Sequence, residues 1–513
     1  MKQYDIIIVT GDYYVDHPLS VAGILVKVLE DKGYTVGIIE KPDWKTDKDF
    51  LKLGAPRLFF GVTSGAVDSM LSNYTPLKKK RSEDKNSPYD SGIPDRAVIV
   101  YCNKLRQLFK SSKIVIGGIE ASMRRFTHYD YWDNAVRKSI LLDSRADILV
   151  YGSGEYQIAK IAEKLNDYKN LDDIEGTCII SKEVPKDFTI LPSHEAVSAD
   201  KKIFCKMQVM FSNCDNLAQK TGDRYVLQHK MHDYTAKELD YVYGLNYSRD
   251  IPKTMPEFKM VQFSVVTHRG CIGDCNFCSL ALHQGNKIIS RSEGSILKEI
   301  ESLTKHKDFK GYIDDLGGPS ANMYGMDCGS CKDSACITCQ NLDKSHSKLI
   351  SLLRKARKIK GIKKIFVRSG VRYDLALASE EYIKELSEHH ISGCLKIAPE
   401  HFSKDVLKLM NKGTGDFLKF KSTFEKHNKE KRQSLKYYLM TAHPGSTMGH
   451  AKHLASEMKK LNNVESVQIF TPTPMTVSTC MYYTGLDPNT LETVYVPYTY
   501  NEKKKQKNIL FGS

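Results

Sequence analysis

The sequence predicts an α/β protein made of two successive series of strand–helix repeats. In the first series, over about the first 180 residues, short apolar runs end in glycine or polar turns, as buried parallel strands do. The second series starts near Met260 and contains six strand–helix repeats. We therefore expect an N-terminal, doubly wound parallel-sheet domain followed by a partial (β/α)6 barrel of the TIM type.

The apolar runs of the first series have the length of strands. They start at Asp5 (DIIIV), Tyr34, Leu58, Lys113 and Ala146. After the first run, residues 18–32 carry apolar side chains at helical spacing, which predicts the first helix. Residues 76–92 are polar and charged with almost nothing apolar to bury, so we expect a mobile insertion there.

The second series predicts the strands and helices of the barrel. Its strand candidates start at Met260, Gly311, Lys363, Gly393, Leu435 and Val464. Helical patterns lie between them at Ser295–Thr304, Lys348–Lys360, Glu380–Glu388 and Met448–Lys460. In a barrel of this kind, the reactive groups lie at the C-terminal ends of the strands.

Domain boundaries follow from these changes of pattern. We predict an N-terminal α/β domain at 1–200 and a helical connector at 201–258, which ends near Pro252 and Pro256. The barrel core is predicted at 259–480 with a cysteine-rich insert at 326–340, and a C-terminal extension with a basic tail at 481–513.

Composition and charge restrict the class of protein. Of the 513 residues, 41% are hydrophobic and 27% charged, which is typical of a folded globular chain. The net charge of +15 favours anionic partners such as nucleic acid, but a lysine-rich solvated surface accounts for much of it and no RNA-binding signature accompanies the charge. No apolar run approaches a membrane span, and the 13 cysteines indicate a reducing cytoplasm in which clustered thiols bind metal.

The stretch CIGDCNFCSL places Cys271, Cys275 and Cys278 at C-x3-C-x2-C spacing directly after the first barrel strand. A structural zinc site needs four protein ligands, one more than this loop supplies. An iron–sulfur cube accepts three thiolates and keeps one iron open for a ligand that is not protein. The loop therefore predicts a 4Fe-4S cluster, with the aromatic ring of Phe277 beside the metal.

A second group of cysteines follows in CGSCKDSACITC, at C-x2-C-x4-C-x2-C spacing. Its members are Cys328, Cys331, Cys336 and Cys339. Four thiolates at this spacing close a tetrahedral zinc site or bind an auxiliary 4Fe-4S cluster, and spacing does not decide between them.

The cysteine loop resembles that of the radical S-adenosylmethionine (SAM) superfamily. The longer stretches THRGCIGDCNFCSLALHQG, DDLGGPSANMYG, RSGVRYD, LKIAPEH, TAHPGST and FTPTPMTVSTCMYYTG are similar to the YgiQ-type radical SAM proteins over nearly the whole chain. This resemblance implies a 4Fe-4S cluster whose open iron binds SAM and whose electron cleaves it to a 5′-deoxyadenosyl radical. It also implies a low-potential electron donor such as flavodoxin or ferredoxin.

The resemblance also assigns cofactor-binding positions at the strand ends. Gly317 and Gly318 stand where the superfamily has the glycine pair that meets the SAM amino group. The acidic residue that often follows this pair is absent, so Asp314 or Asp315 is an alternative partner, or else a solvated turn. Ser369, Arg372 and Asp374 follow the third strand. Lys396, Glu400 and His401 lie at or beyond the fourth strand, and no residue is identified as catalytic.

The N-terminal domain resembles the cobalamin-binding α/β domains that precede some radical SAM barrels. The D-x-H-x-x-G pattern that supplies an axial histidine is absent, since Asp16-His17-Pro18-Leu19 does not match it, and we expect no bound cobalamin. A substrate or partner role fits the strand-end residues better; these are Asp12, Asp16, His17, Gly117, Gly118, Glu120 and Glu155.

The sequence as a whole predicts a radical SAM iron–sulfur enzyme that acts on an unidentified substrate. Two alternatives stay open. One is an RNA-modifying radical SAM enzyme, motivated by the positive charge. The other is a non-enzymatic nucleic-acid or assembly protein in which the seven thiolates hold zinc.

Overall fold

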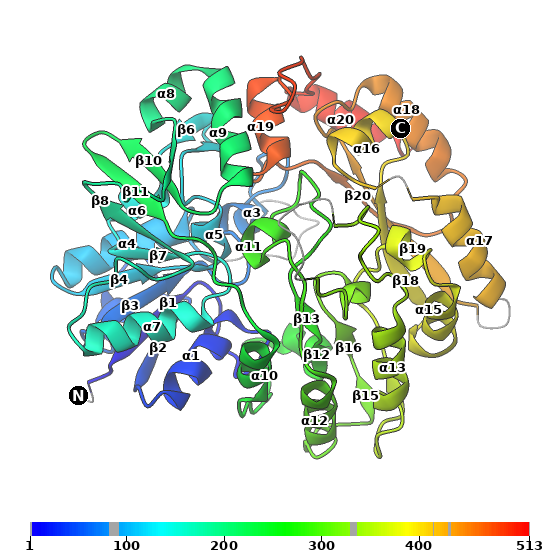
Figure 1. Ribbon diagram of the computed structural model, residues 1–513, viewed down its shortest axis with the longest axis horizontal. Helices are drawn as coiled ribbons and strands as arrows, with labels where there is room; N and C mark the ends of the chain where they lie inside the picture. The colour runs from blue at the N-terminus through cyan, green and yellow to red at the C-terminus, as the bar shows by residue number, and fades with distance from the viewer. Residues whose placement is uncertain (1–2, 82–91, 329–335, 414, 429–431, 512–513) are drawn as a thin grey trace. The chain divides into compact units, whose positions relative to one another are not determined.

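The chain divides into two compact units. The computed structural model describes residues 3–81, 92–328, 336–413, 415–428 and 432–511. The first unit contains residues 1–233, 245–255 and 472–494, and the second contains 234–244, 256–471 and 495–513 (Figure 1). The chain therefore returns to the first unit after most of the second is complete. The domain boundaries expected from the sequence stay a prediction.

The first unit is built on one large sheet. Among the described residues it has nine strands in the order β2-β1-β3-β4-β7-β8-β11-β10-β9. These strands are β1 (Ile6–Thr10), β2 (Val36–Glu40), β3 (Phe59–Thr63), β4 (Lys113–Ile116), β7 (Ile148–Val150), β8 (Thr177–Ser181), β9 (Thr189–Leu191), β10 (Leu217–Thr221) and β11 (Arg224–Gln228). The pairs from β2 to β7 are parallel, whereas β8 and β11 pair antiparallel with their neighbours.

Helices cover both faces of the parallel half of this sheet. The helices of the first unit are α1 (Val21–Asp31), α2 (Lys48–Leu51), α3 (Ser69–Asn73), α4 (Ala97–Leu108), α5 (Gly118–Ser122), α6 (Ile140–Ser144), α7 (Glu155–Asn166), α8 (His194–Ala199), α9 (Lys201–Asn213) and α19 (Val477–Thr484). A small hairpin consists of β5 (His128–Asp130) and β6 (Ala135–Arg137). Helices α1 and α7 pack on the face that carries Ile6 and Ile8, and α4 packs against β3. All five residues of β1 are buried, which explains its uninterrupted apolar run.

Sequence reasoning missed β10 and β11, which lie inside the segment expected to be a helical connector. Their sequences, LAQKT and RYVLQ, lack the apolar run that marks β1. Gln219 and Gln228 are nevertheless buried, because the Gln219 side chain accepts a hydrogen bond from the Thr127 N–H at 2.8 Å and donates one to the Pro192 carbonyl at 3.0 Å. A satisfied buried amide is indistinguishable from a surface residue in the sequence.

The second unit is the predicted partial barrel. Its strands are β12 (Ser264–Val266), β13 (His268–Arg269), β14 (Ile289–Ser290), β15 (Tyr312–Ile313), β16 (Asp315–Gly317), β17 (Lys364–Ile365), β18 (Cys394–Glu400), β19 (Ser434–Thr441) and β20 (Val464–Ile469). Parallel pairs join β12 to β16, β15 to β17, and β18 to β19 to β20. A parallel bridge between Val371 and Ile397 joins the third strand region to the fourth.

Helices pack on the outer face of these strands. The helical segments of this unit are α10 (Ala236–Gly244), η2 (Pro256–Val261), α11 (Leu280–Gln284), α12 (Glu293–Leu303), η3 (Ala321–Met323), α13 (Ser347–Ala356), α14 (Tyr373–Ala376), α15 (Glu380–Glu385), η4 (Leu386–His390), α16 (Lys404–Leu409), α17 (Phe417–Asn428), α18 (Met448–Met458) and α20 (Tyr500–Ile509). Leu395 and Ile397 of β18 pack with Phe420 of α17 in one apolar core. Since side chains alternate along a strand, Lys396 lies on the opposite, inner face. Glu400 follows a register shift near the end of β18, and its carboxylate lies near Lys412.

The segment 472–494 belongs to the first unit through side-chain contacts of α19. The ring of Tyr483 stacks on Tyr129 with a centroid distance of 4.8 Å. The Gln208 amide on α9 donates to the Met475 carbonyl at 3.1 Å. We call residues 472–494 the return segment.

No helix in the described ranges has both the length and the apolar character required to cross a bilayer.

Candidate functional site

The cysteine loop, residues 270–279, follows β13 and bends sharply at its first residue. Gly270 has a φ of +84°, and a Cβ atom there would lie 1.8 Å from the Lys287 carbonyl oxygen, so only glycine fits. The Cys271 N–H donates to the Gly285 carbonyl at 3.1 Å. These contacts fix the point at which the loop leaves the barrel.

Backbone N–H groups of the loop point at its sulfur atoms. The Gly273 N–H donates to Cys271 Sγ at 3.4 Å, and the Leu280 N–H donates to Cys278 Sγ at 3.5 Å. Such donors stabilise negative charge on sulfur and are the outer contacts that tune a bound cluster.

A segment far along the chain holds the other side of the loop. Asn276 donates through its backbone N–H to the Met410 carbonyl and through its side-chain amide to the Leu409 carbonyl, both at 2.9 Å. The Asn411 amide returns a hydrogen bond to the Asp274 carbonyl at 2.7 Å. The loop is therefore clamped from both sides.

Arg372 brings a buried positive charge to the cysteine loop. Its Nη1 lies 3.7 Å from Cys275 Sγ, and its Nε and Nη2 donate to the two Asp374 carboxylate oxygens at 3.0 and 2.5 Å. The Asn322 side chain holds the Arg372 backbone through two hydrogen bonds of 2.9 Å. Burial alone would raise the pKa of Asp374, but the guanidinium holds that pKa below its ordinary value.

Close packing at Gly273 shows how tightly this guanidinium fits. A Cβ atom on Gly273 would lie 2.4 Å from Arg372 Nη1 and 3.2 Å from Cys271 Sγ. The loop and the guanidinium therefore leave no room for a side chain at this position.

Glu400 and Lys412 form a second, half-buried pair beside the loop. Glu400 ends β18 with a φ of +66°, and its Oε1 lies 3.9 Å from Lys412 Nζ. Burial raises the pKa of Glu400, and the charges of Lys412 and Arg372 oppose that rise. Lys396 lies half-buried on the inner face of β18. Arg372 and Lys412 therefore bring two positive charges near the three thiols.

The glycine pair lies at the C-terminal end of β16, against a buried imidazole. A Cβ atom on Gly318 would lie 2.5 Å from the His268 ring, and one on Gly317 would lie 3.4 Å from the Ser369 side chain. Burial lowers the pKa of His268 to about 4, so this ring is neutral at pH 7. Close packing therefore excludes a side chain at Gly318, and the Gly317 carbonyl accepts a hydrogen bond from the Thr267 N–H at 2.8 Å.

The two acids expected as alternative ligands have internal partners instead. Asp315 accepts hydrogen bonds from the Ser369 hydroxyl and from the Arg368 N–H, the latter at 2.7 Å. Asp314 accepts from the Phe263 N–H at 3.0 Å. Both carboxylates connect neighbouring strands. These hydrogen bonds explain why two acids stand side by side at the end of a strand.

Aromatic and imidazole rings line the region beyond β18 and β19. Phe277 packs against Val406, Leu407 and Met410, and its ring meets His443 edge-on at 6.3 Å between centroids. Phe277 is therefore held beside Cys278 by apolar contacts.

The imidazole ring of His401 is buried, with the residue 1% exposed, and one of its nitrogens accepts a hydrogen bond. The Ser403 N–H donates to its Nδ1 at 2.9 Å, which places the proton of the neutral ring on Nε2. This Nε2 is buried and has no hydrogen-bond partner among the described residues. Burial, reinforced by nearby histidines, lowers the pKa of His401 to about 3. The barrel thus contains a neutral, unsatisfied N–H donor.

The described cysteines of the insert pack close to the cysteine loop. Cys328, Cys336 and Cys339 contact an apolar cluster that includes Cys271 and Met323. Cys331 lies outside the described residues. The two groups of thiols therefore share one region of the second unit, which their separation in the sequence does not reveal.

The loop fits an iron–sulfur cluster by the chemistry of its donors. Burial raises the pKa of the Cys278 thiol to about 12 and also raises that of Cys275, so both thiols are protonated at pH 7 without metal. Iron binding would displace these protons. The N–H donors, Arg372 and Lys412 would then offset the negative charge of the thiolates.

Sequence reasoning missed Asn322, Lys412 and His268 as parts of this site. Lys412 acts from a segment that carries no motif, whereas Asn322 and His268 appeared only as parts of the DDLGGPSANMYG and THRG stretches. The one available signal was the position of each near a strand end or a glycine.

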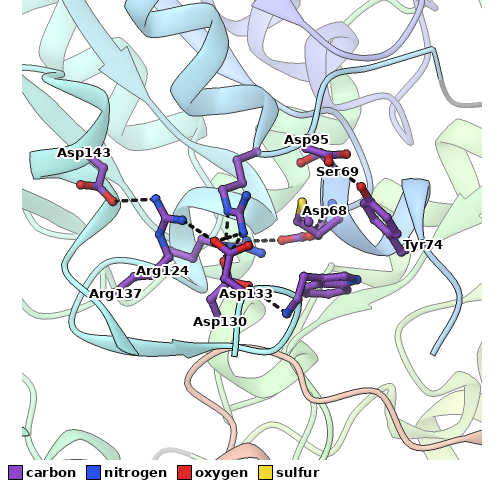
Figure 2. A network of polar contacts seen from close by, with 12 residues as sticks. Asp68, Ser69, Tyr74, Asp95, Arg124, Asp130, Asp133, Arg137 and Asp143 are labelled. Atoms are coloured by element: carbon purple, nitrogen blue, oxygen red, sulfur yellow. Dashed lines mark hydrogen bonds and ion pairs between the residues drawn. The ribbon is translucent and has the colours of Figure 1, made fainter. Parts of the chain in front are cut away.

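In the first unit, three of the strand-end residues expected to have a substrate or partner role make contacts within the unit, and that role stays a prediction. Glu120 accepts hydrogen bonds from the Ser69 and Val98 N–H groups, both at 3.0 Å, at the starts of α3 and α4. Asp68 pairs with the buried Arg124, and Figure 2 shows this pair within a wider network. These contacts cap helices and satisfy buried charges.

Two further strand-end residues are held in the same way. Asp12 accepts from the Ala66 N–H at 2.6 Å. His17 accepts from the Leu19 N–H through Nδ1 at 3.0 Å, and its Nε2 lies 3.1 Å from Arg249 Nη1. Both nitrogens of the His17 ring are therefore engaged.

Comparison with protein families covers nearly the whole chain. The Radical SAM N-terminal family matches residues 1–264, the Radical SAM superfamily matches 265–458, and a domain of unknown function (DUF3362) matches 465–511. A UPF0313 protein of Clostridium botulinum (strain ATCC 19397) is 47% identical over 541 residues, which cover 99% of this chain and 84% of the relative. One from Clostridium perfringens (strain ATCC 13124) is 45% identical over 545 residues, 99% and 82% of the two chains.

Solved structures show the same fold. The radical SAM methyltransferase TsrM of Kitasatospora setae, with cobalamin and a [4Fe-4S] cluster bound, has a TM-score of 0.55 at 14% identity over 94% of this chain and 79% of that chain. The cobalamin-dependent SAM radical enzyme OxsB, with aqua-cobalamin bound, has a TM-score of 0.50 at 13% identity over 89% and 52%.

These similarities identify the class of the protein. They support a radical SAM iron–sulfur enzyme whose specific reaction is unknown, and they give no support to the RNA-modifying and non-enzymatic alternatives. The chain belongs to the UPF0313 family, the YgiQ family of the radical SAM superfamily.

Proposed function

We propose that Cys271, Cys275 and Cys278 hold a 4Fe-4S cluster that binds SAM, and that the enzyme cleaves SAM reductively to act on a substrate still to be identified. The observation that carries this proposal is the cysteine loop itself. Its three thiols follow the first barrel strand, two N–H groups point at their sulfurs, and a buried guanidinium lies 3.7 Å from Cys275 Sγ.

When bound, the cluster would supply one electron to the sulfonium of SAM, giving methionine and a 5′-deoxyadenosyl radical that abstracts hydrogen from the substrate. The residues of the chain position and shield this chemistry. Arg372 and Lys412 offset the charge of the thiolates, and Gly317 and Gly318 stand at the end of β16, where the SAM amino group would bind. Phe277 and His443 would form an apolar wall beside Cys278.

The remaining strand-end groups are assigned to SAM or substrate by their chemistry. Lys396 on the inner face of β18 and Glu400 at the end of that strand supply a cation and an acid that can meet the carboxylate and hydroxyl groups of a ligand. The Ser369 hydroxyl is held by Asp315 at the end of the third strand region. A bound ligand would offer an acceptor to the Nε2 hydrogen of His401. This would remove the free-energy cost of a buried donor that has no hydrogen-bond partner among the described residues.

A low-potential protein such as flavodoxin or ferredoxin would provide the electron, and thirteen cysteines suit a reducing cytoplasm. We propose that cobalamin is not a cofactor. Both ring nitrogens of His17 have partners within the first unit, so this residue offers no axial ligand. TsrM and OxsB contain cobalamin, so the absorbance of the purified protein is the direct check.

Reductive cleavage of SAM tests the main proposal without knowledge of the substrate. The anaerobically purified protein, reconstituted with iron and sulfide and reduced with dithionite, should convert SAM to 5′-deoxyadenosine and methionine. Chromatography with mass detection measures both products. A fully loaded cluster that yields neither product would refute the proposal.

We further propose a second metal site at Cys328, Cys331, Cys336 and Cys339. Replacing Cys336 and Cys339 together by alanine should remove the metal of this site while the cysteine loop still assembles its cluster, because each site draws its thiolates from its own segment. Metal analysis of the parent identifies the ion: about four irons and one zinc indicate a structural zinc, and about eight irons indicate an auxiliary cluster.

The matched control is the double variant Cys214→Ala with Cys394→Ala, which removes two half-buried thiols elsewhere. Its metal content should equal that of the parent. An unchanged metal content in the Cys336 and Cys339 variant would leave the insert as unoccupied thiols and refute the second site.

A further inference from the structure

Two cysteines that no part of the proposed chemistry uses face each other inside the first unit. Cys205 lies on α9 and Cys480 lies on α19 in the return segment. Their sulfur atoms are 3.8 Å apart, and the two residues are 0% and 1% exposed. They are 275 positions apart in the chain, so their meeting is a property of the fold.

A short chain of hydrogen bonds orients this pair. The Cys480 thiol donates to Cys205 Sγ, and the Cys205 thiol donates to the Thr484 hydroxyl oxygen at 3.6 Å. The Thr484 hydroxyl in turn donates to the Cys480 carbonyl at 2.7 Å. The two sulfurs are therefore aimed at each other.

We propose that Cys205 and Cys480 are a redox-active dithiol, which peroxide oxidises to a disulfide that links α9 covalently to the return segment. The sulfurs must approach by about 1.8 Å to reach the S–S bond length of ~2.05 Å. Rotation of two side chains on adjacent helices can supply a movement of this size. This inference goes beyond the proposed function and does not depend on it.

The roles of the two sulfurs differ. Hydrogen bonding from Cys480 lowers the pKa of Cys205 to about 7, whereas burial raises the pKa of Cys480 well above its ordinary value. Thiolate is the nucleophilic form, so at neutral pH Cys205 is the attacking residue and Cys480 the resolving one.

The reaction balances with hydrogen peroxide as the oxidant. The Cys205 thiolate attacks one peroxide oxygen, the O–O bond breaks, and the released hydroxide takes a proton to form water, leaving a sulfenic acid. The Cys480 sulfur then attacks the Cys205 sulfur, the S–O bond breaks, and a second water leaves as the S–S bond forms. Two thiols lose two electrons and two protons, and one peroxide becomes two waters.

Burial selects the oxidant. Peroxide is close to water in size and can reach the pair during local opening of the two helices. A bulky oxidant such as glutathione disulfide requires a much larger opening. We therefore expect peroxide to form the disulfide faster than glutathione disulfide does at equal concentration.

Peptide mapping of the full-length, cluster-loaded protein tests the proposal. After peroxide treatment, alkylation in denaturant and trypsin digestion without reductant, the peptides 203–206 and 461–503 should appear joined and two hydrogens lighter than their sum. Neither peptide contains a cysteine of the cysteine loop or the insert, so damage to a cluster does not obscure the result. Dithiothreitol should separate them.

Cys102 is the matched control, because it is equally buried and faces no second thiol among the described residues. The joined peptides should be at least ~10-fold more abundant than any disulfide of Cys102, given the geometric demand of the bond. Cys205→Ser and Cys480→Ser should each abolish the product, and Cys102→Ser should not. Alkylated or sulfinic Cys205 and Cys480 without the joined peptides in the parent protein would overturn the proposal, even if a variant failed to fold.

Discussion

Replacing Cys275 by alanine is expected to abolish both the 4Fe-4S absorbance and the reductive cleavage of SAM. With two thiolates left, the cluster loses the ligand that lies against the buried Arg372 guanidinium. Changes to outer contacts of metal sites already cost about 10–100-fold, so loss of a direct ligand should lower SAM cleavage by more than about 100-fold. The measurements are iron per chain, visible absorbance and 5′-deoxyadenosine formed after reduction.

Cys394→Ala is the control for this experiment. Cys394 is a half-buried thiol on β18 in the same unit, outside the cysteine loop. It should keep the parental iron content and cleavage rate. Parental SAM cleavage by the Cys275 variant would place the cluster elsewhere in the chain and refute our assignment of the loop.

Replacing Arg372 by glutamine is expected to weaken the fold as well as the cluster. The change leaves the Asp374 carboxylate, which is 9% exposed, without its two guanidinium hydrogen bonds. Removing one partner of a buried ion pair costs about 3–5 kcal/mol of unfolding free energy. Urea denaturation of the apo protein measures this loss. The affinity of the cysteine loop for iron should also fall by about 10–100-fold.

A second substitution separates the two effects of Arg372. Adding Asp374→Asn removes the unpaired charge, so the double variant should regain most of the unfolding free energy. It should not regain cluster affinity, because the cation near Cys275 is still missing. Arg368→Gln, at an exposed arginine of the same loop, should change neither quantity. Full recovery of cluster affinity in the double variant would show that Arg372 acts only through stability.

The sequence was most informative where one residue type dominates a short stretch. The apolar run of β1 and the helical spacing of α1 are local patterns, and both elements formed as expected. The three thiols of the cysteine loop are also local, since they fall within eight consecutive residues. Strands β10 and β11 were missed because buried Gln219 and Gln228 look like surface residues.

The remainder of the site depends on contacts between distant segments. Arg372 reaches Cys275 across 97 positions, and Asn411 reaches Asp274 across 137. No periodicity encodes such pairings, so the contacts that Lys412 and Asn322 make in the site could not be predicted. The acids Glu120 and Asp315 were candidates for ligand contacts because they stand at strand ends. In the fold, both carboxylates accept hydrogen bonds from backbone N–H groups, Glu120 at two helix starts and Asp315 beyond a neighbouring strand.

The course of the return segment has a consequence for how the protein is made. The first unit needs residues 472–494 to be complete, yet these follow almost all of the second unit in the chain. During synthesis, the first unit therefore stays incomplete, with the binding surface for α19 uncovered, until residue 494 has left the ribosome. An N-terminal fragment that stops at residue 264, where the family boundary lies, would keep that surface exposed permanently. Such a fragment should bind chaperones or aggregate, and adding the return segment as a separate peptide should rescue it.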